Sequence, residues 1–253
     1  MTLGDGTPVH HHAEIDSTNA EAARLAASGA GPLWVLADRQ TKGRARRGRS
    51  WSSLDGNLFA SYLCRPNTAP ERAALATFAT SLAVADLATS LLGGQEARIT
   101  LKWPNDVHID GRKAAGILLE SSAGRDGRIG WLVIGIGINL VATPPDADIR
   151  TGGDRPISIA GAGGAVATPL QALRVLSPAL TRWLGRLEVE GFAPIRRSWL
   201  ARAARRGKLI GAGLAAERLE GIFEDVDETG ALVLKTADGA LRQIPAADIY
   251  FPD

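Results

Sequence analysis

Short apolar runs bounded by turn residues recur through the first half of the chain. Their lengths and their content of branched and aromatic residues are typical of buried strands. Two apolar stretches, 107–109 and 114–119, flank an Asp110-Gly111 turn, so we expect a hairpin there. The other predicted strands lie at 33–37, 57–64, 99–103 and 131–138.

Longer stretches carry apolar residues at helical spacing and predict helices between and after the strands. Thr18 and Glu21 have the spacing of a capping box, and Ser28 precedes a glycine that is a typical helix end. We therefore expect the first helix over Thr18 to Ser28. Further helices are expected from about Pro70 to Gly93, from Pro169 to about Glu190 and over 193–204.

Changes in composition divide the chain. The stretch 141–168 is rich in proline, glycine and aspartate, and is predicted to be a long mobile loop that acts as a lid. After Gly207 come short apolar strands and turns such as Asp238-Gly239, which predict a small all-β module. The expected parts are a lead-in over 1–12, a main domain over 13–206 and a β domain over 207–253.

The totals describe a chain of 253 residues with a formal net charge of +2 and one cysteine. Cys64 cannot form an internal disulfide, which fits a reducing cytoplasm. No stretch has eighteen uninterrupted apolar residues, so no membrane span is expected. His10, His11 and His12 have no cysteine or acidic partner at ligand spacing, so we interpret them as a flexible or edge segment.

The densest charge lies in residues 40–51, shortly after the first apolar run. Such a density of positive charge repels itself unless an anion neutralises it, and arginine grips planar oxyanions with a fork of donors. The loop is therefore predicted to close on phosphate or carboxylate groups. Its five basic residues are Lys42, Arg44, Arg46, Arg47 and Arg49.

The same loop admits three other interpretations. A run of charge is often only a solvated surface loop. Gly43 to Ser50 differs from a phosphate-binding P-loop, because Arg49 replaces the lysine and arginines fill the spacer where backbone amides should bind. A nucleic-acid-binding patch is opposed by the net charge of only +2, which makes the basicity local.

Other polar groups stand where predicted elements begin or end. Residues 17–19 (Ser-Thr-Asn) present hydroxyl and amide groups at a helix N-terminus, where a small polar ligand can bind. Residues 102–106 and Lys113 are grouped at the ends and bend of the hairpin. The glycines within 135–139 permit a close approach of a ligand or another backbone. His108 is expected on a solvated strand face.

Taken together and in this order, the segments resemble the biotin–protein ligases from about Ala13 to the C-terminus. Residues 17–19 match the family's serine-threonine-asparagine corner, and 43–51 match its G-R-G-R-x-G-R-x-W loop. The other matches are 102–106 to K-W-P-N-D, 113–116 to K-x-x-G and 135–139 to G-x-G-x-N. The resemblance implies an α+β fold, with a mixed β-sheet flanked by helices as in class II aminoacyl-tRNA synthetases and the biotin–lipoate ligases. A small C-terminal SH3-like β-barrel is expected to follow.

The chain departs from the family pattern in places. Ala45 stands where the second glycine of the loop is usual, so we expect its φ to stay negative. No tryptophan lies near Pro156, where some relatives stack the adenine. The family's longer members begin with a DNA-binding winged helix, whereas this sequence starts at the catalytic domain. We therefore expect no repressor function and no DNA partner.

The resemblance implies a reaction in two steps. Biotin and ATP first give biotinyl-5'-AMP and pyrophosphate, and a lysine of a biotin carboxyl-carrier domain then takes the biotinyl group and releases AMP. Lys113 is expected to touch the biotin carboxylate and the α-phosphate, and Arg46 to grip phosphates together with Mg²⁺. Asp106 has three open roles: to orient Lys113, to bind Mg²⁺ or to take a proton from the acceptor lysine.

The same resemblance assigns residues to each substrate. Those expected to bind biotin are Ser17, Thr18, Asn19, Gln40, Arg44, Ala45, Arg46, Lys113 and Gly116. Those expected to bind ATP or the adenylate are Arg47, Arg49, Trp51, Lys102, Asn105, Asp106 and Asn139. No dedicated metal ligand is assigned, because Mg²⁺ is expected to bind through the ATP phosphates.

Two alternatives differ in substrate or in class. A lipoate–protein ligase or octanoyl transferase looks like the same catalytic fold, but the lipoyl relatives lack this arginine-rich loop and the K-W-P-N-D stretch. A non-enzymatic nucleic-acid-binding protein would use the basic loop alone. Many biotin–protein ligases pair through the edge of the central sheet, so a homodimer is a further hypothesis. We expect a cytoplasmic protein with no membrane partner.

Overall fold

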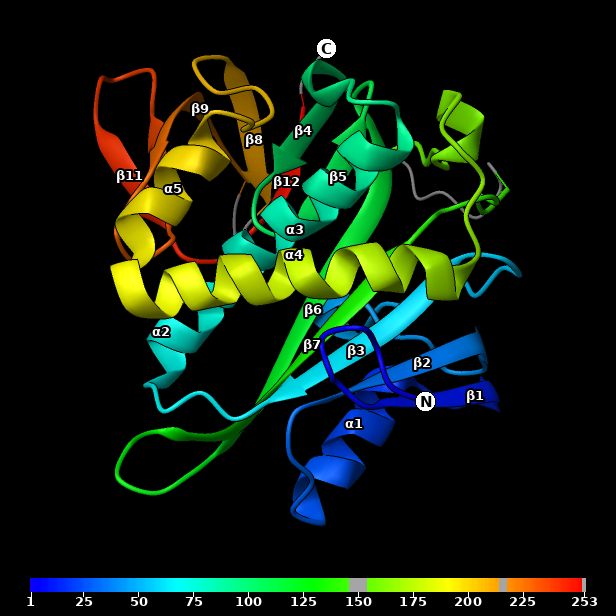
Figure 1. Ribbon diagram of the computed structural model, residues 1–253. Coiled ribbons are helices and arrows are strands. Elements are labelled where there is room, and N and C mark those ends of the chain that lie inside the picture. The colour runs from blue at the N-terminus through cyan, green and yellow to red at the C-terminus, as the bar shows by residue number, and fades with distance from the viewer. Residues whose placement is uncertain (146–153, 214–217, 252–253) are drawn as a thin grey trace.

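The computed structural model describes residues 1–145, 154–213 and 218–251. Two β-sheets organise this part of the chain (Figure 1). The larger sheet has seven strands in the order β1-β2-β3-β7-β6-β5-β4. Every strand predicted between residues 33 and 138 is present in it. The strands are Val9–Ile15 (β1), Leu33–Gln40 (β2), Leu58–Cys64 (β3), Ile99–Lys102 (β4), Asp106–Ile109 (β5), Arg112–Ala123 (β6) and Ile129–Ile138 (β7).

The large sheet is mixed, as expected. β1 pairs in parallel with β2, and the other neighbouring strands are antiparallel. Because β1 begins at Val9, opposite Trp34, the expectation that 1–12 is only a lead-in is wrong from Val9 onward. An edge strand exposes most of its side chains, so it lacks the apolar run on which the prediction relied. The interpretation of His10, His11 and His12 as an edge segment is confirmed.

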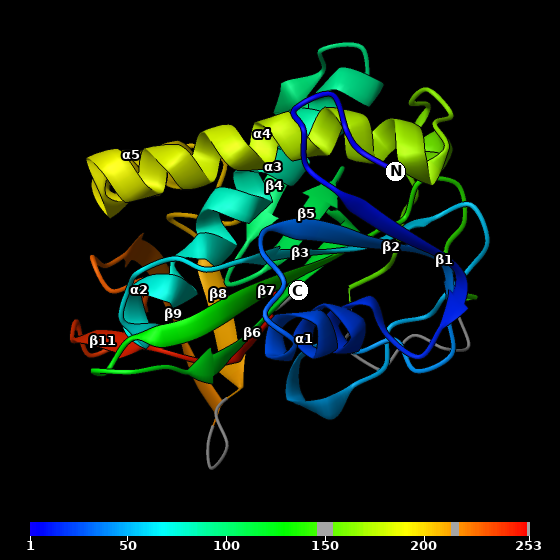
Figure 2. The ribbon, with the colours of Figure 1, turned by 60° about the horizontal axis from the view of Figure 1, so that its bottom comes forward.

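The two faces of the sheet are covered by different helices. Trp34 and Val35 are neighbours in β2 but belong to separate apolar clusters, as the alternation of side chains along a strand requires. The larger cluster lies under α3 (Ala76–Leu91) and α4 (Pro169–Glu190). The smaller cluster lies under α1 (Thr18–Ala27), which is on the face opposite to α4 (Figure 2).

The long Ala/Leu-rich helix is interrupted at Leu75, which separates α2 (Pro70–Ala74) from α3. By length and composition, Pro70–Leu91 could cross a membrane, but 67% of its apolar window is buried within the protein. Its apolar side chains pack against the sheet, α4 and α5 (Phe192–Leu200). The composition of this helix is therefore that of a core helix.

The start of α1 differs from the prediction. Ser17 is the N-cap with extended backbone, and no side chain caps the helix. Thr18 and Glu21 form no capping box, because the Thr18 hydroxyl donates to Gln40 Oε1 at 3.1 Å. Thr18 therefore contributes to a polar corner beside the sheet instead of to the helix cap.

The stretch 141–168, predicted to be a mobile lid, is anchored in the part that the structure describes. Residues 146–153 lie outside the described residues. After them, Ile157 and Ile159 are buried, and their amides donate hydrogen bonds of 2.9 Å to the backbone of β6 and to the residue that follows β7. The lid expectation is therefore wrong for 154–159, because its alternating isoleucines enter the core.

The second sheet has five antiparallel strands in the order β11-β10-β9-β8-β12. It has the small SH3-like character that was expected, but it is open, since β11 and β12 form its two edges in the described chain. Trp103 Nε1 donates to Gly230 O at 3.0 Å and joins this sheet to the larger one. The strands are Leu209–Gly213 (β8), Arg218–Val226 (β9), Leu232–Lys235 (β10), Leu241–Ile244 (β11) and Asp248–Tyr250 (β12).

Candidate active site

A cavity of about 860 Å³ lies between the large sheet, the basic loop and β12. Its lining brings together all five motifs, although they are far apart in the sequence. The assignment of each residue to biotin or to ATP stays a prediction. The predicted residues that line the cavity are Ser17, Thr18, Asn19, Gln40, Arg44, Ala45, Arg46, Arg47, Arg49, Trp51, Lys102, Asn105, Asp106, Lys113, Gly116 and Asn139.

A network of neutral polar groups around α1, which we call the polar corner, comprises Ser17, Thr18, Asn19 and Gln40 in the cavity wall and Ser61, which is bonded to them. The amide and the hydroxyl of Thr18 both donate to Gln40 Oε1, at 2.9 and 3.1 Å. Ser61 Oγ lies 2.8 Å from Thr18 Oγ1 and 2.6 Å from Asn19 Oδ1. These side chains are largely buried, so their donors and acceptors are held in fixed directions.

Glycines let other groups lie directly against the sheet backbone. A Cβ at Gly135 would lie 2.1 Å from Asn19 Oδ1, and one at Gly137 would lie 2.6 Å from Trp51 Cε2. A Cβ at Gly116 would lie 2.8 Å from Trp51 Cζ3. The indole of Trp51 therefore rests on the neighbouring strands β6 and β7. The predicted close approach at these glycines is confirmed.

Two cations and one carboxylate meet in the cavity. Lys113 Nζ lies 2.8 Å from Asp106 Oδ1 and 5.4 Å from the centroid of the Trp51 ring. Arg46 Nη1 donates to Asn105 Oδ1 at 3.3 Å. Burial lowers the pKa of Arg46, while the charge of Asp106 raises it. Arginine starts from so high a pKa that the Arg46 guanidinium stays charged at neutral pH.

The basic loop is tied to two other elements by ion pairs. Arg47 Nη1 and Arg49 Nη2 lie 3.0 and 2.8 Å from the two carboxylate oxygens of Asp248 in β12. Arg44 Nη2 lies 2.9 Å from Glu120 Oε2 in β6. Three of the four arginines that were predicted to meet a free anion thus have carboxylate partners within the protein, whereas Arg46 donates to Asn105.

The backbone of the basic loop forms a compact turn. Ala45 has φ of −126°, as predicted, and Arg47 takes the left-handed conformation with φ of 57°. Ala45 N donates to Arg49 O at 2.7 Å, and Trp51 N donates to Gly43 O at 3.0 Å. A Cβ at Gly43 would lie 2.6 Å from Trp51 O, so this position requires glycine.

Asp154, which no sequence motif pointed to, joins the site beside Lys102. Lys102 Nζ lies 2.7 and 2.6 Å from the two carboxylate oxygens of Asp154. Burial raises the pKa of Asp154, but His108 and Lys102 outweigh this effect and hold that pKa well below its usual range. Lys102, predicted to bind ATP, therefore has a carboxylate partner in the protein.

His108 is fully buried, so its predicted position on a solvated strand face is wrong. The alternation along β5 is kept, with Asp106 and His108 on one face and Val107 and Ile109 on the other, but His108 lies against Asp154, so both faces of the strand are covered. His108 Nε2 lies 3.5 Å from Asp154 Oδ2, and neither ring nitrogen makes a hydrogen bond of normal geometry within the described residues.

Asp106, His108 and Asp154 offer ligand atoms that lie within 4.8 Å of one another. Both carboxylates already contact an ammonium group, Asp106 that of Lys113 and Asp154 that of Lys102. The group is therefore balanced in charge without a resident metal ion. Asp106 lines the cavity with hard oxygen donors, so it fits Mg²⁺ that is shared with nucleotide phosphates.

Sequence reasoning missed four residues of the site: Ser61, Glu120, Asp154 and Asp248. None of them belongs to a motif. Asp154 and Asp248 line the cavity, whereas Ser61 and Glu120 are bonded to residues that line it. Conversely, Asn139 lines the cavity but also donates to the carbonyls of β6 and of the anchored segment, at 3.5 and 3.3 Å.

A neutral polar corner beside a group of cations suits a site for a small organic acid and the phosphates of a nucleotide, since oxyanions bind to cations. The model of the biotin/lipoate A/B protein ligase family matches residues 13–139, and that of the biotin protein ligase C-terminal domain matches residues 212–251. The chain therefore belongs to the biotin/lipoate A/B protein ligase family, and within it to the biotin–protein ligases.

Individual relatives agree with this placement. The chain is 44% identical to the biotin–[acetyl-CoA-carboxylase] ligase of Paracoccus denitrificans over 239 residues, which cover 94% of this chain and 98% of the relative. It is 32% identical to the bifunctional ligase/repressor BirA of Bacillus subtilis over 256 residues, covering 96% of this chain and 74% of the relative. Among solved structures, the biotin protein ligase from Aquifex aeolicus in complex with biotin and ATP is similar with a TM-score of 0.78 and 25% identity, covering 96% of this chain and 98% of that one.

Proposed function

We propose that this protein is an ATP-dependent ligase that forms an amide bond between biotin and a lysine of a biotin carboxyl-carrier domain. In the first step, a carboxylate oxygen of biotin attacks the α-phosphorus of ATP, pyrophosphate leaves, and biotinyl-5'-AMP remains in the cavity. In the second step, the acceptor amine attacks the acyl carbon, AMP leaves with the bonding electrons, and the amine loses one proton.

The observation that carries this proposal is the presence of the polar corner and the cations Lys113 and Arg46 in one cavity. The ureido ring of biotin is neutral and offers both N–H donors and a carbonyl acceptor, which complement the fixed groups of Thr18 and Gln40. Carboxylate and phosphate oxygens require cations. A lipoyl or octanoyl chain has no polar ring atoms to bind such a corner, so the biotin substrate is favoured over that alternative.

The residue roles follow from the charges in the cavity. Lys113 and Arg46 stabilise the negative charge that develops at the α-phosphate, and Asp106 orients Lys113 through the 2.8 Å contact. Asn105 fixes Arg46 through its side-chain oxygen. Trp51, which rests on the glycines of β6 and β7, forms the wall on the nucleotide side.

In this function, Mg²⁺ binds together with the nucleotide. When bound, Mg²⁺ supplies neutralisation of phosphate charge, and Asp106 would hold it together with the ATP phosphates. The protein's own part is to hold Lys113 and Arg46 in the lining of the cavity.

The partners and location complete the proposal. The acceptor is the carrier domain of a biotin-dependent carboxylase, and the name of the Paracoccus relative makes acetyl-CoA carboxylase the first to test.

β1 pairs only with β2 among the described strands, so its free edge is the surface for a homodimer. Arg44, Arg47 and Arg49 of the basic loop pair with carboxylates, which supports a protein without a DNA partner. The single cysteine supports a cytoplasmic location.

The test is incubation of the pure protein with Mg-ATP, a biotin carboxyl-carrier domain and either biotin or lipoate, followed by the intact mass of the carrier. We expect the carrier to gain one biotinyl group, and to gain nothing with lipoate. A gain with lipoate alone would move the substrate to the sister enzymes. Absence of both a mass gain and of any adenylate would refute the ligase proposal.

A further inference from the structure

Glu120 has no part in the chemistry described above, yet its carboxylate joins two parts of the site. Glu120 Oε2 accepts hydrogen bonds from Asn19 Nδ2 at 2.7 Å and from Arg44 Nη2 at 2.9 Å. Asn19 belongs to α1, and Arg44 belongs to the basic loop. A single oxygen in β6 thus holds a buried amide on one side and a guanidinium of the loop on the other.

These contacts complete a ring of polar groups. The ring runs from Gln40 at the end of β2 through Thr18, Ser61 and Asn19 to Glu120. From Glu120 it returns to the loop that follows Gln40, through Arg44. Ser61 has a single hydroxyl proton, so it donates to Thr18 or to Asn19 at any one time. In the other hydrogen bonds of the ring, the donor and the acceptor are fixed. The first part of the basic loop is therefore bonded to the polar corner twice, through Gln40 directly and through Arg44 by way of Glu120.

Asn19 has little freedom to find another partner. Its side chain lies against Gly135, where an added Cβ would meet its oxygen at 2.1 Å. Its Nδ2 has one other acceptor among the described residues, Leu118 O, at the longer distance of 3.3 Å. Loss of the Glu120 carboxylate would leave a buried donor poorly satisfied, which is more costly than loss of an exposed contact.

We propose that Glu120 is a positioning residue for biotin. This inference rests on the proposed function, because it takes the polar corner to be the site of the ureido ring. Glu120 fixes Asn19 from one side and Arg44 from the other, so the corner and the start of the loop keep their relative places. Because Glu120 contacts Asn19 and Arg44, which are predicted to bind biotin, and none of the residues predicted to bind ATP in the described structure, it acts on the affinity for biotin and not on that for ATP.

Two variants separate the two contacts. Glu120→Gln keeps the shape and one acceptor but removes the charge that holds Arg44. Both side chains of that pair are partly exposed, so we expect the Kd for biotin to rise by at most about fivefold. Glu120→Ala also removes the acceptor of the Asn19 amide, and the Kd should rise by about tenfold or more.

The experiment titrates biotin into each variant by calorimetry without ATP, and then measures KM for biotin and for ATP from pyrophosphate release. Limited trypsin digestion supplies an independent measure of order in the basic loop, since its arginines are intact in both variants. We expect faster cleavage in the loop and an unchanged KM for ATP. Glu190→Gln is the matched control, because Glu190 pairs with Arg186 at 3.0 Å on α4, with side chains of similar exposure.

A second measurement separates positioning from a general loss of structure. In an Arg44→Gln background, Glu120→Gln should have almost no further effect on the Kd for biotin, because the ion pair is already absent. The inference is overturned if both Glu120 variants bind biotin like the wild type, or if KM rises equally for ATP and biotin. A wild type that binds biotin but releases no pyrophosphate would refute the proposed function and leave this binding test intact.

Discussion

The ammonium of Lys113 has a carboxylate on one side and an indole ring on another, at 2.8 Å from Asp106 and 5.4 Å from the Trp51 centroid. Such neighbours limit where the charge can lie, and a cation held in place before the reaction stabilises developing oxyanion charge without further reorganisation. At the scale of single residues, activity should therefore depend on this one side chain more than on the other cations of the cavity.

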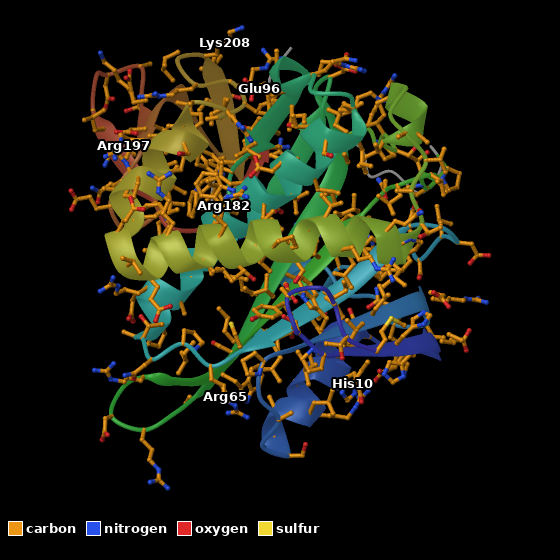
Figure 3. The ribbon with its side chains drawn as sticks, in the orientation of Figure 1. His10, Arg65, Glu96, Arg182, Arg197 and Lys208 are labelled. Atoms are coloured by element: carbon orange, nitrogen blue, oxygen red, sulfur yellow. The ribbon has the colours of Figure 1, made fainter. Side chains whose placement is uncertain are left out.

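Replacement of the lysine tests this dependence. We expect Lys113→Ala to lower adenylate formation by about 100-fold or more, because one preorganised donor at an oxyanion has an effect of that size. Pyrophosphate release measures the first step, and carrier mass measures both. Lys208→Ala is the control, since Lys208 is exposed and lies at the outer surface (Figure 3). Equal losses in the two variants would contradict the role of Lys113.

A single methyl group tests the wall on the nucleotide side. In Gly137→Ala the new Cβ would lie 2.6 Å from Trp51 Cε2, so the indole must move from the sheet. Overpacking of this kind costs about 1–3 kcal/mol, so KM for ATP should rise by about tenfold. Gly185→Ala in α4 is the matched control, because nothing lies within 4 Å of its added Cβ, and there we expect only a gain in stability of about 1 kcal/mol. An unchanged KM in Gly137→Ala would show that Trp51 is not part of the ATP site.

At the scale of elements, the segment 154–159 is attached to the large sheet by one buried ion pair as well as by its isoleucines. Asp154 holds Lys102 through both carboxylate oxygens, and its pKa lies well below the usual range. A carboxylate with a lowered pKa in the folded state stabilises the fold above the pKa of the unfolded chain, about 4, and loses that contribution as the pH falls further.

This linkage gives a prediction with a definite sign. Asp154→Asn should be less stable than the wild type at pH 7, and the difference should shrink as the pH falls below about 4. Urea unfolding of both proteins across this pH range measures it. Asp55→Asn is the control, because Asp55 is exposed in the turn before β3. A difference that stays constant with pH would mean that the ion pair with Lys102 does not anchor the segment.

The elements also show how far sequence reasoning reaches. Apolar runs located β2, β3 and β7, and the motifs brought the predicted site residues into one cavity, because each motif lies near an end of a strand or helix or in a loop between strands. The edge strand β1 was missed because most of its side chains are exposed, and His108 was misplaced because Asp154, which is distant in the sequence, lies against its face of β5. Asp154 and Glu120 depend on tertiary contacts that no local pattern records.

At the scale of the whole molecule, the two sheets share one apolar core. Phe223 and Leu232 of the small sheet belong to the same cluster as Phe78 and Trp199 of the main domain. Trp103 adds a hydrogen bond to the small sheet. Each large apolar side chain contributes about 1.5–3 kcal/mol on burial. Several of them together approach the total stability of a typical domain, about 5–15 kcal/mol.

The shared core predicts that the molecule unfolds as one unit. Urea unfolding followed by tryptophan fluorescence and by far-UV circular dichroism should give coincident transitions. A chain that ends at residue 206 exposes Phe78 and Trp103, so it should lose cooperative unfolding. Two separated transitions in the full chain, or a stable shortened chain, would show that the sheets are independent.

Five of the cations around the cavity each pair with a carboxylate of the protein, whereas Arg46 donates to Asn105. When a nucleotide binds, each of these cations therefore exchanges a carboxylate of the protein for a phosphate oxygen, so the phosphates do not meet unpaired positive charges. Such an exchange releases few counterions into solution, so the affinity for ATP should depend on ionic strength much less than the number of cations implies. Polyanions of no fixed shape should bind weakly for the same reason. The pairs are Lys102 with Asp154, Lys113 with Asp106, Arg44 with Glu120, and Arg47 and Arg49 with Asp248.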